Sequence, residues 1–460
     1  MSERVEAPRD DAPSSDDGAT GRVPLPPPPA PPTSRLPPVL TEAPVPPARH
    51  GRLHPRSATR AVLRGVASVV GIALLAVTAI SAYAVADLVA PVAAKPSVRF
   101  ESEDVLAAVP DIGAMEGGLN FLLVGSDKRP ADGSFGDPYL DSATLNDVTM
   151  LLHIAEDHSH VEVVSFPRDM LVDVPACQDP NDAAGTLYEQ YSVKLNTVLA
   201  YGGLSCVGRT IEQLVGITIP VGGIVEFKGV AALAEAVGGV EVCLVDPIDD
   251  VYSGLKLDAG VHEITGATAL AFLRTRHAVG DGSDLGRISA QQTFLASLAR
   301  TLQADGTLGD PLKLYSIAQA VLKNMTLSSA LQDPFRLVSI ARTLQDVDLS
   351  KIAFIQYPTA YTADFSAVVP STSAGIVEQA LQSDRPVSFD PDATGNASFG
   401  TVEAEGGGEA EPTTPPPTDA TAPATTPPAT TEPPDPGEVL PSDVTGQTAE
   451  DVRCTTANAG

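Results

Sequence analysis

A run of 22 residues without a charge, from Gly65 to Ala86, constrains this chain more than any other feature. A helix of this length spans the hydrocarbon core of a bilayer. Five arginines precede the run, Arg49, Arg52, Arg56, Arg60 and Arg64. A signal peptide is the alternative, but the run is too long and begins too far along the chain. By the positive-inside rule, we expect a single-pass membrane protein with a cytoplasmic N-terminus and an extracellular domain.

Two segments have the composition of disordered chain. Residues 1–60 and 387–447 are rich in Pro, Ala, Thr, Ser, Gly and acidic residues and poor in aromatic residues. Such segments cannot bury enough apolar surface to offset the entropy lost on folding. We therefore expect a disordered cytoplasmic tail at 1–60, a transmembrane helix at 61–90, a folded domain at 100–386, a disordered Thr/Pro-rich linker at 387–447 and a C-terminal tip at 448–460.

The net charge of −29 argues against a nucleic-acid partner, because binding to phosphates needs clustered Lys and Arg. The four cysteines all follow the predicted span, where an oxidising compartment permits two disulfides. We favour the pair Cys177–Cys206, since both residues flank one surface insertion, and this leaves Cys243 with Cys454. The sequence by itself allows three connectivities.

Strand-like and helix-like patterns alternate through the region from 120 to 358. Short apolar, β-branched runs predict strands at 120–124, 148–154, 161–166, 240–244 and 352–357. Helical patterns lie near 207–215, 228–237, 265–272, 288–304, 312–323 and 334–345. The alternation predicts an α/β fold, an α/β/α sandwich with a central mixed sheet, after the single N-terminal transmembrane helix.

Three charged residues are predicted to converge at one edge of this sheet. The link AEDHSH between 148–154 and 161–166 is short enough for an antiparallel hairpin, which makes Asp147 and Arg168 neighbours. Asp127 follows the strand 120–124 and reaches the same edge if that strand runs parallel to 161–166. Ligands of open α/β sheets bind at such strand ends. His153, His158 and His160 surround the hairpin turn, and we expect them to be solvated.

A second group of polar residues occurs between 274 and 291. If the segment is extended, Arg274 and Arg276 lie on one face, with Arg287 one loop later. Clustered arginines imply either ion pairs with Asp281 and Asp284 or a bound phosphate.

Gln291 falls on the apolar stripe of the predicted helix 288–304, where a polar side chain needs a partner. The partner is either the backbone or a ligand in a pocket beside the helix.

Seven sequence blocks in order resemble the LytR–CpsA–Psr family of envelope phosphotransferases. The blocks are NFLLVGSDKR, NDVTML, VVSFPRDM, KLNTVLAYGG, FKGVAALAEAVGGVEV, LAFLRTRH and DLGRISAQQ, which together cover about residues 118–305. The resemblance implies that the catalytic site consists of six charged residues, Asp127, Asp147, Arg168, Arg274, Arg276 and Arg287. It implies substrate contacts from four others, Lys194, Asp284, Gln291 and Arg129.

The resemblance also implies a function and a cofactor. Asp127 and Asp147 would hold Mg²⁺ or Mn²⁺, and the arginines would bind a pyrophosphate. The expected reaction transfers a glycopolymer from a polyprenyl-pyrophosphate carrier in the membrane to peptidoglycan, forming a phosphodiester during cell-wall assembly. Asp147 and Asp169 are both candidates for the general base. A polyprenyl-pyrophosphate hydrolase or carrier and a non-catalytic envelope surface protein are the alternatives.

Two positions depart from the family pattern, because Leu145 and Ala290 stand where an arginine is common. An apolar channel for the lipid is expected between helices and sheet, lined by five residues, Leu214, Val230, Leu233, Phe294 and Leu298.

Overall fold

The computed structural model describes residues 58–93, 98–100, 117–129, 133, 144–182, 184–280, 282–304, 310–390, 399–400 and 437–458. Contacts divide the chain into two units, Met1–Gly71 and Ile72–Gly460. Helix α1 (Ala58–Ala93) contains the predicted apolar run. Its segment Val62–Asp87 has a mean hydropathy of 2.3 and is long and apolar enough to cross a membrane. The predicted tail before residue 58 lies outside the described residues.

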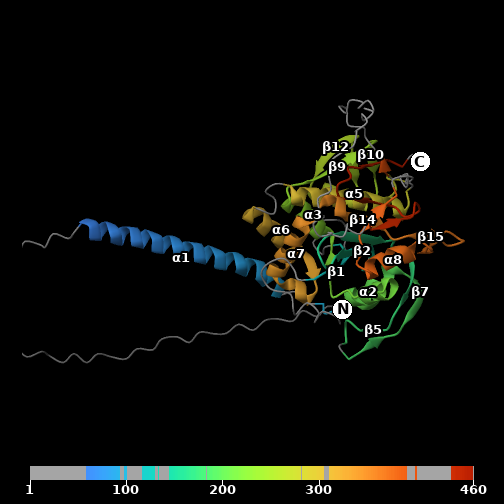
Figure 1. The fold of residues 1–460 in the computed structure, drawn as a ribbon, viewed down its shortest axis with the longest axis horizontal. Coiled ribbons are helices and arrows are strands. Elements are labelled where there is room, and N and C mark those ends of the chain that lie inside the picture. The colour runs from blue at the N-terminus through green and yellow to red at the C-terminus, as the bar shows by residue number, and fades with distance from the viewer. Residues whose placement is uncertain are drawn as a thin grey trace, which may run out of the picture. The chain divides into compact units, whose positions relative to one another are not determined.

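A seven-stranded mixed sheet forms the centre of the folded domain (Figure 1). Its order is β13 (Met325–Leu327), β8 (Val221–Val225), β1 (Leu119–Ser126), β2 (Asn146–Ile154), β3 (Val161–Phe166), β14 (Ile352–Gln356) and β20 (Gly446–Thr448). Strands β2 and β3 form the predicted antiparallel hairpin. Strand β1 is antiparallel to β2 and parallel to β8, and β3 is parallel to β14. The mixed sheet expected from the sequence is therefore confirmed.

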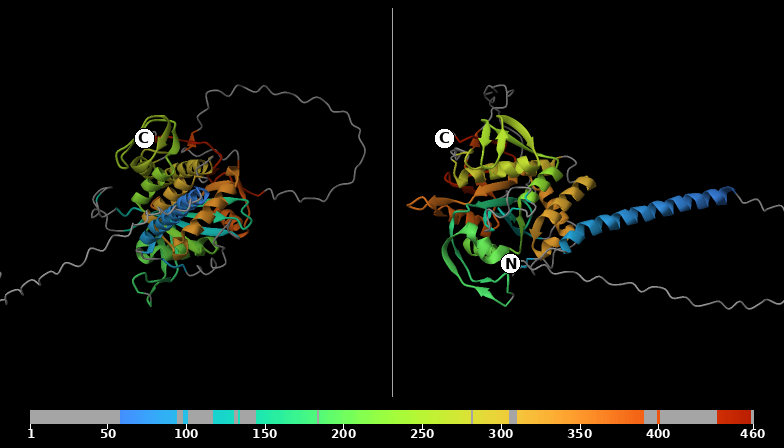
Figure 2. Two further views of the ribbon diagram at one scale, coloured as in Figure 1. Left: turned by 90° about the vertical axis from the view of Figure 1, so that its left-hand side faces the viewer. Right: turned by 180° about the vertical axis from the view of Figure 1, so that it is seen from behind.

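Helices cover both faces of the sheet, because its central strands are apolar on both sides. All six residues of β3 are buried, as in strands that lie between two helical layers. On one face lie α2 (Val198–Val215) and α8 (Ala374–Gln382), and on the other α5 (Asp284–Gln303), α6 (Pro311–Asn324) and α7 (Pro334–Asp346). Figure 2 shows these layers from two further directions. Helix α2 bends at Gly203, whose φ of 72° favours glycine.

A second, smaller sheet carries the strand predicted at 240–244, which the alternating pattern had suggested for the central sheet. Its order is β12 (Gly260–Ile264), β9 (Val240–Leu244), β21 (Cys454–Thr455) and β18 (Phe399–Gly400). Helices α3 (Phe227–Ala236), α4 (Gly266–Arg274) and α5 share an apolar cluster with this sheet. Because α5 packs against both sheets, it connects them through its two sides.

The remaining strands form short two-stranded pairs around the core. They are β4 (Leu171–Val174) with β7 (Gln190–Lys194), β5 (Cys177–Gln178) with β6 (Thr186–Leu187), β10 (Ile248–Asp250) with β11 (Leu255–Leu257), β15 (Thr359–Tyr361) with β16 (Val368–Pro370), and β17 (Val387–Phe389) with β19 (Glu438–Leu440). Three 3₁₀ turns complete the described elements, Leu195–Thr197, Ser329–Gln332 and Leu349–Lys351.

Strands lie at both ends of the predicted linker 387–447. Strands β17 and β19 pair within the two ends of that range, and β20 joins the edge of the central sheet beside β14. Buried apolar residues explain this, since Leu440 and Val444 pack into the core next to α8. Residues 391–398 and 401–436, in the middle of the predicted linker, lie outside the described residues.

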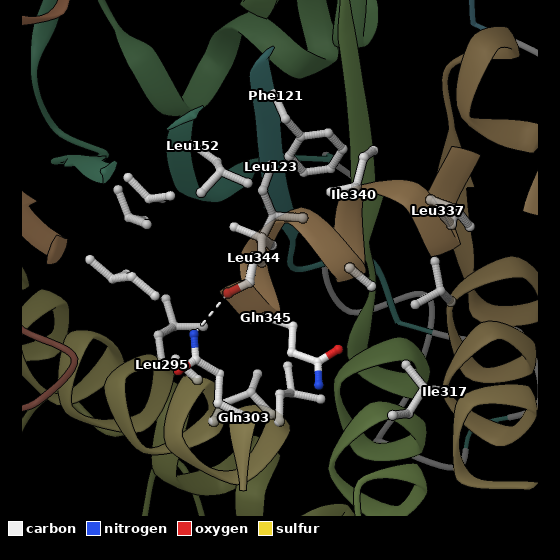
Figure 3. Close-up of a pocket in the computed structure, with 18 of the residues that line it drawn as sticks. Phe121, Leu123, Leu152, Leu295, Gln303, Ile317, Leu337, Ile340, Leu344 and Gln345 are labelled. Carbon is white, nitrogen blue, oxygen red and sulfur yellow. Dashed lines mark hydrogen bonds between the residues drawn. The ribbon is translucent and has the colours of Figure 1, made fainter. Parts of the chain in front are cut away.

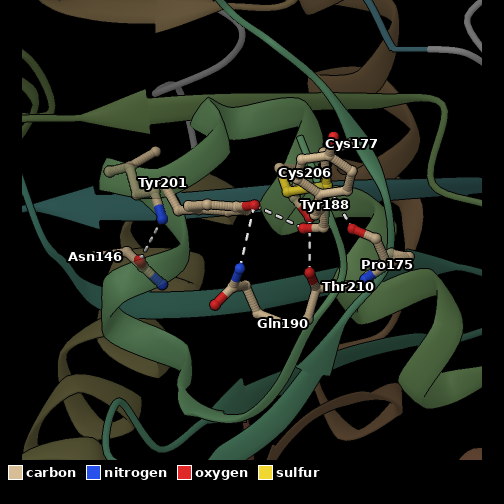
Figure 4. Close-up of a disulfide and its surroundings, with 9 residues drawn as sticks. Asn146, Pro175, Cys177, Tyr188, Gln190, Tyr201, Cys206 and Thr210 are labelled. Carbon is tan, nitrogen blue, oxygen red and sulfur yellow. Dashed lines mark hydrogen bonds between the residues drawn. A yellow bond between two sulfur atoms is a disulfide. The ribbon is translucent and has the colours of Figure 1, made fainter. Parts of the chain in front are cut away.

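Both favoured disulfides are confirmed. Cys177–Cys206 joins β5 to α2 across a sequence separation of 29 residues (Figure 4). Beside it, the hydroxyl group of Tyr201 on α2 donates a hydrogen bond to the carbonyl oxygen of Tyr188 at 2.6 Å. Cys243–Cys454 joins β9 to the C-terminal tip across 211 residues.

Candidate active site

The ends of three strands bring the predicted acidic and basic residues to one edge of the central sheet. Asp127 follows β1, Asp147 is the second residue of β2, and Arg168 follows β3. The Asp127 carboxylate accepts a hydrogen bond of 3.0 Å from the backbone N–H of Leu145, which places the end of β1 against the start of β2. The convergence predicted from the hairpin is therefore present.

A β-bulge determines the direction of the Asp147 side chain. Gly125 pairs with Val148 and Ser126 pairs with Asn146, so Asp147 is the extra residue. Asn146 faces α2, where its Oδ1 accepts a hydrogen bond of 3.1 Å from the N–H of Leu199. The bulge turns Asp147 to the other side, into a cavity beside α5. Bulges often re-aim a side chain next to a functional site.

Arg168 is the centre of an ion-pair network. Its Nη1 donates a hydrogen bond of 2.7 Å to Oδ1 of Asp147, and its Nε lies 3.5 Å from Asp169 and 3.8 Å from Asp284. Its backbone N–H also donates to Oδ2 of Asp284 at 3.1 Å. Burial lowers the pKa of Arg168, but the three carboxylates raise that pKa by more, so Arg168 remains a cation.

The first turn of α5 completes the network. Ser283 caps this helix by accepting a hydrogen bond from the N–H of Leu285. Arg287 is 6% exposed, and its Nη2 lies 2.5 Å from Oδ1 of Asp284 and donates to the Asp147 carbonyl at 2.7 Å. Together with these charges, the N–H groups of a helix N-terminus create a favourable position for an anion.

Gln291 lies one turn further along α5, where its side chain has a backbone partner. Its Nε2 donates a hydrogen bond of 3.1 Å to the carbonyl of Leu273, and the side chain lines the same cavity as Asp127 and Asp147. The backbone therefore fixes the amide group, which remains at the wall of the cavity.

Arg274 and Arg276 diverge, contrary to the expectation that both would lie on one face. Arg274 is the last residue of α4, so the segment is not extended before Thr275. Arg274 lines the cavity with the aspartates, and its guanidinium group lies 4.4 Å from the ring centroid of Phe227. Burial and the nearby Arg129 lower the pKa of Arg274. Phe227 lies in one of the sequence blocks that resemble the family, but the sequence did not predict its cation–π contact with Arg274.

Arg276 lies in a neighbouring polar cavity of about 270 Å³ with Asp169 and Lys194. Lys194 Nζ is 2.8 Å from Oδ1 of Asp169. Burial raises the pKa of Asp169, but Lys194 and Arg168 lower it by more, and the net pKa lies below the ordinary value of 3.8. Tyr361 of the β15–β16 hairpin also lines this cavity. Asp281, the other predicted partner of the arginines, lies outside the described residues.

A larger apolar cavity lies between the sheet and α5, α6 and α7 (Figure 3), next to the aspartate-lined cavity. The aspartate-lined cavity has a volume of about 160 Å³ and the apolar one about 350 Å³. They share four lining residues, Leu123, Met150, Leu295 and Leu298. In the larger cavity, Gln303 donates its amide N–H groups to the backbone carbonyls of Leu344 and Val347. These hydrogen bonds provide partners for the polar end of its side chain. A charged site thus adjoins an apolar cavity.

Four of the five predicted channel residues line the smaller cavity, Val230, Leu233, Phe294 and Leu298. Leu214 does not, because α2 covers the opposite face of the sheet, where Leu214 packs against another cluster. Helices α6 and α7 supply much of the larger cavity wall and were not assigned to it from the sequence. Periodicity predicts that a helix is amphipathic, but it does not say which face of the sheet it covers.

The residues at the sheet edge fit a divalent cation with a preference for oxygen ligands. Asp127 and Asp147 both line the smaller cavity. Two carboxylates beside a cavity that can hold an anion are the ligands from which Mg²⁺ sites with bound phosphate are built. Of the two departures from the family pattern, Ala290 is 1% exposed in an apolar cluster, and the backbone N–H of Leu145 binds Asp127.

The fold and the site define an α/β protein with a candidate anion site beside an apolar cavity. Residues 91–383 match the LytR_cpsA_psr family, and the chain belongs to this family. The cell wall biosynthesis protein LcpA of Corynebacterium glutamicum is 32% identical over 275 residues, which cover 54% of this chain and 52% of LcpA. The chain thus spans about half the length of this curated relative.

Other relatives cover different shares of the chain. The polyisoprenyl-teichoic acid–peptidoglycan teichoic acid transferase TagT of Bacillus subtilis is 25% identical over 252 residues, covering 53% of this chain and 70% of TagT. Among solved structures, a LytR-Csp2A-Psr enzyme from Actinomyces oris has a TM-score of 0.42 and 20% identity, covering 63% of this chain and 95% of that chain.

Proposed function

We propose that this protein transfers a glycopolymer from a polyprenyl-pyrophosphate carrier to peptidoglycan during cell-wall assembly. The observation that carries the proposal is that the charged cavity and the larger apolar cavity adjoin and share four lining residues. A polyprenyl pyrophosphate has the same division, with two phosphates at one end and a long hydrocarbon chain at the other. The transferase name of TagT, a relative from the same family, agrees with this reaction.

The side chains at the sheet edge would bind the pyrophosphate. Arg274 and Arg287 line the smaller cavity, Arg168 pairs with Asp147 at its wall, and the N-terminus of α5 adds backbone N–H groups. Planar guanidinium groups suit phosphate oxygens. A bound Mg²⁺ or Mn²⁺ held by Asp127 and Asp147 would supply further charge stabilisation for the leaving lipid phosphate.

The acceptor is assigned to the polar cavity on the other side of Arg168. A peptidoglycan sugar hydroxyl attacks the phosphorus next to the polymer, a P–O bond to that hydroxyl oxygen forms, and the P–O bond to the polyprenyl phosphate breaks. The hydroxyl proton passes to a carboxylate. Asp169 lines the polar cavity, whereas Asp147 lies among the groups assigned to the metal and the pyrophosphate, so we assign the base to Asp169. The lowered pKa of Asp169 keeps its carboxylate ionised, which is the form that can accept a proton, although it also makes Asp169 a weaker base.

The apolar helix Val62–Asp87 would anchor the domain beside its lipid substrate. The arginines before the helix support a cytoplasmic N-terminus and an extracellular domain by the positive-inside rule. In that orientation the polymer carrier, the catalytic domain and the peptidoglycan all meet on the outer side of the membrane.

The test is a mass-resolved assay of the full chain in detergent, with a polyprenyl-pyrophosphate oligosaccharide, peptidoglycan fragments and Mg²⁺. We expect an oligosaccharide joined to the fragment by a new phosphodiester, and loss of this product with a chelator. Arg168→Ala removes charge-assisted bonds worth about 1.5–3 kcal/mol each, so the pyrophosphate affinity should fall at least about tenfold. Arg209→Ala is the matched control, because Arg209 lies on α2 and is not part of the ion-pair network around Arg168.

Two other outcomes would replace the proposal. Release of lipid phosphate without a linked product would establish a hydrolase. Neither turnover nor pyrophosphate binding would leave a surface protein without catalysis.

A further inference from the structure

A second cluster of polar side chains lies at the opposite end of the β2–β3 hairpin. His153 near the end of β2, His160 just before β3 and Asp384 after α8 each offer one nitrogen or oxygen atom, and these atoms lie within 4.8 Å of one another. Glu162 pairs with His153 across the two strands, so both side chains project from the same face. Its Oε1 is 3.8 Å from Nε2 of His160.

These side chains are buried, although the turn residues were expected to be solvated. His153 is 7% exposed, His160 is 3% exposed and Glu162 is 1% exposed. The side-chain nitrogen Nε2 of His160 and both carboxylate oxygens of Glu162 have no hydrogen bond of normal geometry in the described part of the chain, although the backbone N–H of Val387 lies near the Glu162 carboxylate. Buried polar groups are rarely left in this state, because each loses its hydration without compensation.

The hydrogen bonds of His153 also indicate that a positively charged partner is missing from this cluster. Asn120 donates its amide N–H to the carbonyl of Thr218 at 2.7 Å, so its Oδ1 faces Nδ1 of His153, also at 2.7 Å. Oδ1 is an acceptor, and therefore the His153 proton is on Nδ1 and Nε2 of a neutral ring carries a lone pair. This lone pair lies 3.0 Å from Oδ1 of Asp384, a second acceptor. Two acceptors at this distance need a cation or a proton between them.

We propose that His153, His160, Glu162 and Asp384 bind one zinc ion, at a site separate from the proposed reaction site. Two imidazoles and two carboxylates are a ligand set that suits Zn²⁺ rather than Mg²⁺. Asn120 acts as the outer partner that orients His153, an arrangement typical of zinc-bound histidines. The other His160 nitrogen, Nδ1, lies 2.9 Å from the hydroxyl group of Ser159 and leaves Nε2 for the metal.

The position of this site indicates a structural role. His153 and Asp147 are on the same strand, and six residues of strand separate the two sites by about 20 Å. The ion would tie the hairpin turn to the segment between α8 and β17. Asp384 in that segment has a φ of 51°, an uncommon conformation for a residue other than glycine. A metal bond would compensate for this conformation and hold the end of α8 against the sheet.

The test is calorimetric titration of the chelator-treated full chain with zinc chloride, followed by elemental analysis of the metal content. We expect one zinc equivalent that is retained in Asp127→Asn, lost in His160→Ala and retained in His262→Ala, the control on β12. Zinc should also raise the thermal midpoint of the wild type and leave that of His160→Ala unchanged. If His160→Ala does not fold, Asn120→Ala keeps all four ligands and should weaken zinc binding about 10–100-fold.

A wild-type chain that binds no zinc equivalent would overturn the proposal and make His153 a protonated partner of Asp384. Zinc that is lost in Asp127→Asn but not in the His160 or Asn120 variant would also overturn it, since that metal would belong to the reaction site. Transfer activity is not the readout, so failure of the zinc site leaves the proposed function unaffected.

Discussion

Filling the larger apolar cavity should lower the affinity for polyprenyl pyrophosphates with a long chain and leave the affinity for those with a short chain unchanged. Ala318 on α6 lines this cavity of about 350 Å³, and Ala318→Phe places a ring there that is roughly the size of one isoprenyl unit. Each buried CH₂ is worth about 0.8 kcal/mol, so excluding a five-carbon unit costs at most about 4 kcal/mol. The rest of a long chain can rearrange, and we therefore expect the affinity to fall by at least about tenfold, which corresponds to about 1.4 kcal/mol.

The assay compares the binding of a full-length polyprenyl pyrophosphate with that of a geranyl pyrophosphate. The short lipid reaches only the smaller cavity beside Asp127, so its affinity should be the same in the wild type and in Ala318→Phe. Ala267→Phe, at an exposed position on α4, is the control for adding a ring without filling the cavity. Equal binding of the long lipid by the wild type and Ala318→Phe would refute the assignment of the channel to the lipid chain.

Three further predictions concern stability and charge. Replacing Cys177 and Cys206 by serine opens a loop closed across 29 residues and should lower the free energy of unfolding by about 3–4 kcal/mol in urea titrations. Arg287→Met leaves the buried Asp284 carboxylate without its nearest cation and should cost about 3 kcal/mol in the same measurement. Because the folded-state pKa of Asp169 is lowered, the stabilisation is present above the ordinary value of 3.8 and is lost as the pH falls through the folded pKa. Lys194→Met should therefore destabilise the protein at neutral pH, and this difference should shrink below pH 3.8 in parallel unfolding curves.

The sequence predicted that Asp127, Asp147 and Arg168 converge at one edge of the central sheet, because local patterns determine this arrangement. The short hairpin link places Asp147 beside Arg168, and the direction of the first strand brings Asp127 to both. The bulge that aims Asp147 into the cavity was not predictable, since it depends on how β1 and β2 align. The end of α4 at Arg274 was also missed, because two residues that alternate in a strand diverge when one of them ends a helix.

Contacts between distant segments account for the other differences. Gln447 of β20 pairs with Phe354, and no periodicity in either segment indicates that they meet. His153 and His160 flank a polar turn, which by itself predicts solvation. They are buried because the segment around Asp384, more than 220 residues along the chain, packs over the turn, where Asp384 lies 3.0 Å from His153 at a separation of 231 residues.

The attachment of the C-terminal tip affects how the domain folds and how it responds to proteolysis. The central sheet acquires its edge strand β20, and β9 acquires the disulfide to Cys454, only from the last part of the chain. The domain therefore cannot reach its final form until synthesis is complete. A protease that cuts between Gly400 and Gly437 would leave two polypeptides joined by one disulfide and by strand pairing of β19 with β17, β20 with β14, and β21 with β9 and β18. Such a nicked protein should migrate as a single band until it is reduced, and a separately supplied C-terminal peptide should be able to complete a truncated domain.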